Sequence, residues 1–145
     1  MSSRNRDPGV TALYLLDTNI LIAALKGRPS VRQRLETLPL SSLRLSAIVL
    51  GELAFGAEKS TQGERNRARL AALAQRLPLV GLSLEATRHY ARVRALLERQ
   101  GTPIGANDTW IAAQALAIKA TLVTDNTREF ARVPELMLEN WLDKD

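Results

Sequence analysis

The chain of 145 residues has no cysteine and a single histidine, His89. Without thiols it can form no disulfide, no thiolate metal site and no cysteine nucleophile. No residue requires an oxidising compartment, so we expect a cytoplasmic protein. Zinc is disfavoured as a cofactor because it binds mainly to cysteine and histidine. Side-chain oxygens therefore remain as the main candidate metal ligands.

Long hydrophobic runs are also absent. The apolar stretch "LYLLDTNILI" at residues 13–22 is interrupted by Asp17 and Asn19, well short of the ~20 apolar residues that span a bilayer. We therefore expect no signal peptide, no transmembrane helix and no membrane partner.

Glycine and proline are sparse, with 8 and 6 residues, while 46% of the residues are hydrophobic and 24% are charged. This balance is typical of a globular protein. A chain of this length can bury roughly 70% of its unfolded surface without disulfides or metal. Because the first residues are polar and include the breaker "DPG", we expect a flexible tail at residues 1–10 and one domain at residues 11–145.

Short apolar runs alternate with segments of helical periodicity, which predicts an α/β fold with a parallel sheet covered on both faces. The expected strands are residues 12–18, 43–46, 79–83, 121–124 and 136–140. The expected helices are residues 19–25, 30–38, 46–60, 62–77, 84–101 and 105–120. Sheets of this kind bind ligands at the carboxyl ends of their strands.

Four acidic residues lie in apolar surroundings. Asp17 and Asp125 each close a predicted strand, so both should emerge at the carboxyl edge of the sheet. Glu52 lies on an apolar helix face, where a carboxylate costs several kcal/mol unless it is paired. Asp108 opens a buried helix, where it either caps the helix or belongs to a site.

A cluster of carboxylates persists only if a cation neutralises it or a proton is shared, because like charges repel. Oxygen ligands favour Mg²⁺ or Mn²⁺. We expect Asp17 and Asp108 to be direct ligands, with Glu52 and Asp125 binding the same ion, binding a second ion or orienting water. Whether one metal ion binds or two stays open.

Competing motifs fit poorly. A haloacid-dehalogenase-like phosphatase needs a second aspartate where Asn19 stands. "GTPIGAND" lacks the lysine and hydroxyl residue of a phosphate-binding loop. A serine triad would depend on His89, which we expect on a helix surface.

Four segments resemble, in order and spacing, the motifs of PIN-domain ribonucleases, and specifically of VapC toxins. They are "LLDTNILI", "SAIVLGELAFG", "IGANDTWIAAQAL" and "LVTDNTREFARVPEL". The resemblance runs from Leu13 to Trp141. It implies a Rossmann-like three-layer sandwich with a five-stranded parallel sheet, and a cytoplasmic homodimer that cleaves RNA, often tRNA, with Mg²⁺ or Mn²⁺. It also implies a VapB-like antitoxin that covers the site, in a toxin–antitoxin hetero-oligomer.

The resemblance also assigns roles to individual residues. Asp17, Glu52 and Asp108 match the three firmly acidic positions, and Asp125 best matches the more variable fourth, with Glu129 as a substitute. The expected polar supports are Thr18, Asn19, Asn107 and Thr124.

Arginines fill two predicted helices of this chain, whose net charge is +5. They are Arg65, Arg67, Arg69 and Arg76 on one helix, and Arg88, Arg92, Arg94 and Arg99 on the other. Such rows can follow an RNA backbone, although a solvated helix face explains any single arginine. Trp110 can stack on a base, but we expect it in the core. The apolar surplus around residues 20–25 and 47–55 suggests a groove for a partner helix or a dimer face.

The sequence thus predicts an RNA-cleaving toxin that depends on metal. Two alternatives stay open: a PIN-domain nuclease that processes RNA or DNA without an antitoxin, and a noncatalytic RNA-binding PIN domain. The second would be expected to have lost at least one of the acids.

Overall fold

The computed structural model describes residues 12–142, so the tail expected at residues 1–10 lies outside the described residues. Five parallel strands form one sheet in the order β3-β2-β1-β4-β5, which confirms the predicted sheet. The strands are β1 (Tyr14–Leu16), β2 (Leu43–Ser46), β3 (Leu79–Val80), β4 (Thr121–Val123) and β5 (Leu138–Glu139).

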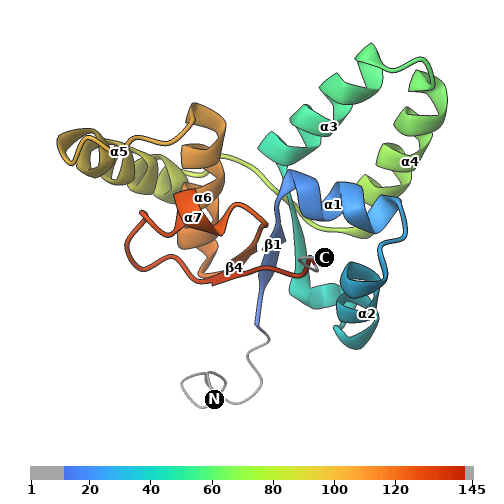
Figure 1. Cartoon of the computed structure of the whole chain (residues 1–145), viewed down its shortest axis with the longest axis horizontal. Coiled ribbons are helices and arrows are strands. Elements are labelled where there is room, and N and C mark those ends of the chain that lie inside the picture. The colour runs from blue at the N-terminus through green and yellow to red at the C-terminus, as the bar shows by residue number, and fades with distance from the viewer. Residues whose placement is uncertain (1–11, 143–145) are drawn as a thin grey trace.

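Helices surround this sheet, with α5 and α6 packed together on one side and α3 and α4 paired on the other (Figure 1). The helices are α1 (Thr18–Leu25), α2 (Pro29–Thr37), α3 (Ala47–Lys59), α4 (Gly63–Arg76), α5 (Leu84–Arg99), α6 (Ala106–Ile118) and α7 (Thr127–Phe130). A 3-10 turn, η2, spans Leu40–Ser42. Neither η2 nor α7 was expected from the sequence, because both are too short to show periodicity.

The core lies along the central strands. Leu15, Leu45 and Leu122 are fully buried, as expected for parallel strands that are covered on both faces. Helix α6 is buried along Ile111–Ala115, which confirms the prediction from its apolar sequence. Within residues 12–142, no helix is both long and apolar enough to cross a membrane.

The strand predicted at residues 79–83 ends early, at Val80. Its partner β2 ends there too, because Ser46, which pairs with Val80, caps α3. At this point Gln114 of α6, which is fully buried, donates its amide Nε2 to the carbonyls of Val80 and Gly81 at 3.0 and 3.1 Å. Its Oε1 accepts a hydrogen bond from the Ser46 hydroxyl at 2.5 Å. A side chain therefore takes up carbonyls that a longer strand would use in the ladder.

Candidate functional site

Asp17 lies at the carboxyl edge of the sheet, between β1 and α1. Its amide donates to the carbonyl of Val123 at 2.9 Å, and its carboxylate accepts from the Thr18 amide and the Thr124 hydroxyl, both at 2.8 Å. The residue is 8% exposed. Burial raises the pKa of Asp17, and the charges of Glu52 and Asp125 add to this effect, while the two hydrogen bonds oppose it.

Asp108 lies in the first turn of α6, but it does not cap the helix. The capping position is Gly105, without a side-chain hydrogen bond, so the capping interpretation of Asp108 is wrong. The pKa of Asp108 is raised to about 6, first by burial and then by the charges of Asp17, Glu129 and Glu52. Asp108 thus lies within the electrostatic reach of three other acids, close to the end of β1.

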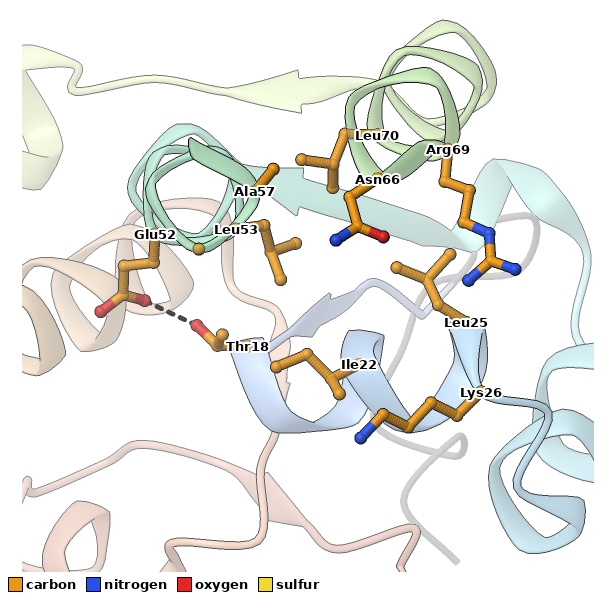
Figure 2. Close-up of a pocket in the computed structure, with 11 residues that line it drawn as sticks. Thr18, Ile22, Leu25, Lys26, Glu52, Leu53, Ala57, Asn66, Arg69 and Leu70 are labelled. Atoms are coloured by element: carbon orange, nitrogen blue, oxygen red, sulfur yellow. Dashed lines mark hydrogen bonds between the residues drawn. The ribbon is translucent and has the colours of Figure 1, made fainter. Parts of the chain in front are cut away.

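The apolar helical neighbours of Glu52 suggested that its side chain faces the core. In the structure Glu52 is instead half-buried on α3. The Thr18 hydroxyl donates to its Oε1 at 2.6 Å (Figure 2), and the Asn107 amide donates to its Oε2 at 3.3 Å. These two contacts connect α3 to the first turns of α1 and α6. They provide the pairing that an acid in apolar surroundings requires.

Two acids, Asp125 and Glu129, are candidates for the fourth acidic position. Asp125 is exposed and accepts from the Asn19 amide at 3.2 Å. Glu129 of α7 is half-buried and accepts from the Asn126 amide at 2.9 Å. The charge of Asp125 acts on Asp17, and that of Glu129 acts on Asp108. The two candidates therefore act on different acids, Asp125 on Asp17 and Glu129 on Asp108.

The predicted polar supports all contact acids: Thr18 and Asn107 bind Glu52, Thr124 binds Asp17, and Asn19 binds Asp125. Sequence reasoning missed Asn126, which holds Glu129. The sequence offered one signal: Asn126 precedes Glu129 by three residues, a spacing at which two side chains can meet at the start of a helix.

The donor set suits a hard divalent cation, because it consists of carboxylates and neighbouring acids raise the pKa values of Asp17 and Asp108. Across residues 12–142, no three His, Asp or Glu side chains stand close enough to hold one ion together. Hydrogen bonds draw Glu52 and Asp125 toward Thr18, Asn107 and Asn19. Since Mg²⁺ typically uses only one or two carboxylates and keeps its waters, Asp17 and Asp108 fit that ion.

A groove of about 250 Å³ begins at Glu52 and runs between α1, α3 and α4. Its walls are mostly apolar, with Ile22, Leu53 and Leu70 among them, and Lys26 and Arg69 lie at the end away from Glu52 (Figure 2). The apolar surplus noticed in the sequence around residues 20–25 and 47–55 thus lines, in part, a groove that opens beside the acids.

Two of the predicted basic residues are engaged in exposed ion pairs. Arg67 contacts Glu58 at 3.2 Å, and Arg94 contacts Glu98 at 3.0 Å. Trp110 is half-buried and does not belong to the core cluster, so the expectation that it packs in the core is wrong. It lies outside that core, on the side of α6 that meets α5.

Comparison with known proteins identifies the family. The PIN domain family matches residues 14–136. Ribonuclease VapC2 of Rickettsia felis is 43% identical over 131 residues, which cover 89% of this chain and 98% of that protein. The tRNA(fMet)-specific endonuclease VapC of Shigella flexneri is 41% identical and covers 88% of this chain and 97% of that protein.

Solved structures agree with this match. The crystal structure of VapBC2 from Rickettsia felis, bound to a promoter DNA fragment, superposes with a TM-score of 0.82 at 41% identity, covering 90% of this chain and 99% of that chain. DNA-bound VapBC from Salmonella typhimurium superposes with a TM-score of 0.84 at 38% identity, covering 91% and 100%. In fold and in sequence, the chain belongs to the VapC branch of the PIN-domain family.

Proposed function

We propose that this protein is the toxin of a type II toxin–antitoxin system, a Mg²⁺-dependent endoribonuclease that cleaves RNA, with tRNA as its substrate. The observation that supports the proposal is the raised pKa of two carboxyls, Asp17 directly after β1 and Asp108 in the first turn of α6, with the charge of Asp17 contributing to the shift of Asp108. Ribonuclease and endonuclease relatives at 41–43% identity support the same reaction class.

In this proposal Asp17 and Asp108 hold the ion directly, while Glu52 and the pair Asp125 and Glu129 border it. When bound, Mg²⁺ lowers the pKa of a coordinated water and neutralises charge on the phosphate oxygens; Mn²⁺ supplies the same chemistry. Thr124 and the Thr18 amide fix the orientation of the Asp17 carboxylate. Side chains held in this way lose little freedom when the substrate binds.

The tRNA assignment follows the relatives, one of which is named a tRNA(fMet)-specific endonuclease. The net charge of +5 suits a polyanionic substrate. The separate possibility of a noncatalytic RNA-binding domain is disfavoured, because all four predicted acids are present. The other alternative, a PIN-domain nuclease that processes RNA or DNA, would use the same acids and differs from a toxin in having no antitoxin.

The decisive experiment compares the purified protein with Asp17→Asn on total tRNA with Mg²⁺, with Mn²⁺ and with EDTA. Asparagine retains the acceptor for the Thr18 amide, so the start of α1 is preserved. We expect defined fragments only from the unmodified protein with metal. Equal cleavage by the variant, or cleavage that persists in EDTA, would disprove the metal-dependent assignment.

We also propose that a VapB-like antitoxin inserts an apolar segment into the groove beside Glu52. The apolar walls and the two cations at the far end support a helix or peptide with acidic residues at one end. The relatives of known structure are VapBC complexes. A partner in this groove would end beside the acids and block the approach of RNA.

Two glycines of α3 provide a matched test of the groove. Gly56 lines it and Gly51 does not, and a Cβ at either position meets no atom within 4 Å. Leucine at each also favours the helix. We expect Gly56→Leu to weaken antitoxin binding in a pull-down and to keep RNA cleavage, while Gly51→Leu changes neither. Equal antitoxin binding by both variants would place the antitoxin elsewhere.

Three further assignments are part of the proposal: a cytoplasmic location, a homodimer that forms a hetero-oligomer with the antitoxin, and a single domain over residues 11–145. They follow from the VapC resemblance. Sedimentation of the free protein and of its complex with the antitoxin measures the two assemblies.

A further inference from the structure

The hydrogen bond between Asn107 and Glu52 joins α6 to α3 beside the acids, with Nδ2 and Oε2 3.3 Å apart. One turn further along each helix, on the same face, stands an aromatic residue: Phe55 on α3 and Trp110 on α6. From the site, α3 and α6 run in different directions (Figure 1). Each ring therefore stands one helical turn from the contact that joins α3 to α6 beside the acids.

Neither ring contributes to the core. Phe55 is 64% exposed, and Trp110 is half-buried outside the core cluster. A protein gains little stability from a ring such as Phe55 that is left largely in water, because the hydrophobic contribution scales with the area removed from solvent. Trp110 packs on Tyr90 of α5 instead of entering the core. Both residues lie one helical turn from side chains beside the acids.

A cation lies beside Phe55, and another lies beside Tyr90, the ring on which Trp110 stacks. The Lys59 ammonium lies 5.0 Å from the centroid of the Phe55 ring. Trp110 stacks on Tyr90, with centroids 3.7 Å apart and planes at 13°. Arg94 donates to the Tyr90 hydroxyl at 2.8 Å and lies 5.9 Å from that ring. A ring next to a cation suits a nucleotide, because the ring takes the base and the cation attracts the phosphate.

We propose that single-stranded RNA is held across the acids by two stacking contacts, with one base on Phe55 and another on Trp110. Tyr90 and Arg94 hold the Trp110 ring in place from behind. The inference rests on the proposed ribonuclease function and adds the two side chains, Phe55 and Trp110, that would hold unpaired bases of its substrate beside the acids. Paired bases stack on each other and leave no face for these rings.

The test measures binding of a fluorescein-labelled single-stranded RNA to the cleavage-deficient Asp17→Asn protein. Phe55→Ala and Trp110→Ala are each expected to lower affinity about 5- to 150-fold, the equivalent of ~1–3 kcal/mol per stacked base at 1.4 kcal/mol per tenfold. Leu84→Ala is the matched control, because Leu84 is 68% exposed and not aromatic; we expect it to leave affinity unchanged.

An RNA with one abasic nucleotide separates stacking from a structural effect. When the missing base is the one that meets Trp110, Trp110→Ala is expected to cause no further loss, while Trp110→Phe retains most of the affinity for intact RNA. Scanning the abasic position along the RNA locates that base. Losses that are equal at every abasic position, or no loss with either alanine variant, would overturn the proposal.

Fluorescence gives an independent signal. The chain has two tryptophans, so in a Trp141→Phe background the emission reports Trp110 alone. We expect intact RNA to quench it and an RNA lacking the stacked base not to. If the alanine variants instead convert a dimer into monomers in sedimentation, and lose RNA affinity only through that change, the rings form a protein interface and the proposal is wrong.

Failure of this inference can be told from failure of the proposed function. If the unmodified protein cleaves tRNA and both alanine variants keep its KM and kcat, only the stacking contacts are disproved. If the unmodified protein neither binds nor cleaves RNA under any metal condition, the ribonuclease assignment fails and the stacking proposal fails with it.

Discussion

The acids of the site fall into an inner pair, Asp17 and Asp108, and an outer pair, Asp125 and Glu129, which are held in different ways. The inner pair is half-buried or buried, and burial is the first cause of its raised pKa values. Each outer acid accepts one side-chain amide, while Asp17 accepts two hydrogen bonds and Asp108 accepts none among the described residues. The pairs therefore differ in burial, and a cation bound to the inner pair would relieve its cost.

Replacing an inner acid is expected to have the largest effect. Asp108→Asn removes a charge from a position that accepts no hydrogen bond among the described residues, so we expect the fold to be kept. Cleavage of tRNA should fall by more than about a hundredfold, beyond the 10–100-fold typical of residues that only orient a ligand. Initial rates at saturating Mg²⁺, with circular dichroism as the folding control, measure it. A rate within tenfold of the unmodified protein would remove Asp108 from the inner pair.

The outer pair offers a sharper comparison, because its members differ in exposure. Glu129 is half-buried and its charge acts on Asp108, whereas Asp125 is exposed. We expect Glu129→Gln to lower kcat about 10–100-fold, in the range of orienting residues, and Asp125→Asn to lower it less than about tenfold. Both substitutions remove one negative charge and retain one side-chain oxygen that can accept the hydrogen bond from asparagine.

The opposite order would also be informative. If Asp125→Asn has the larger effect and Glu129→Gln almost none, then Asp125 is the fourth acid, as the sequence motif first suggested. A similar loss from both would mean that the two carboxylates act as a pair. A Mg²⁺ titration of each variant separates lost metal affinity from lost turnover.

Much of this site follows from the sequence, for a physical reason. Asp17 directly follows a short apolar strand, and parallel strands bring their carboxyl ends to one edge. The polar supports Thr18, Asn19, Asn107 and Thr124 are sequence neighbours of the acids, so the same segments carry both. Local order along the chain therefore specifies most of the inner site.

The parts that escaped prediction depend on contacts between distant segments. The sequence named Glu129 only as a substitute for Asp125, and the effect of its charge on Asp108 depends on the place of α7, a four-residue helix with no periodic pattern. Trp110 was expected in the core because its neighbours are apolar, but it stacks on Tyr90 from another helix. Gln114 reads as one polar residue in an apolar helix, yet it holds the end of β3.

The smallest expected effect concerns stability without metal, and it also separates the inner from the outer pair. The pKa of Asp108 is about 6 in the folded protein and near 3.8 in the unfolded chain. Between these values the folded state binds more protons, so stability is present at low pH and is lost as pH rises from about 4 to about 6. The raised pKa of Asp17 acts in the same direction.

Asp108→Asn is therefore expected to raise the Tm of the metal-free protein at pH 7.5 by a few degrees, since each kcal/mol shifts Tm by roughly 2–4 °C at this size. The difference from the unmodified protein should shrink toward pH 5, where Asp108 is mostly protonated. Asp125→Asn, which removes an exposed acid, is the control and should shift Tm little at either pH. Added Mg²⁺ should reverse the order, because an ion bound only to the folded state stabilises the unmodified protein and not Asp108→Asn. A Tm difference that is the same at both pH values would mean that ionisation of the Asp108 carboxyl does not destabilise the folded protein.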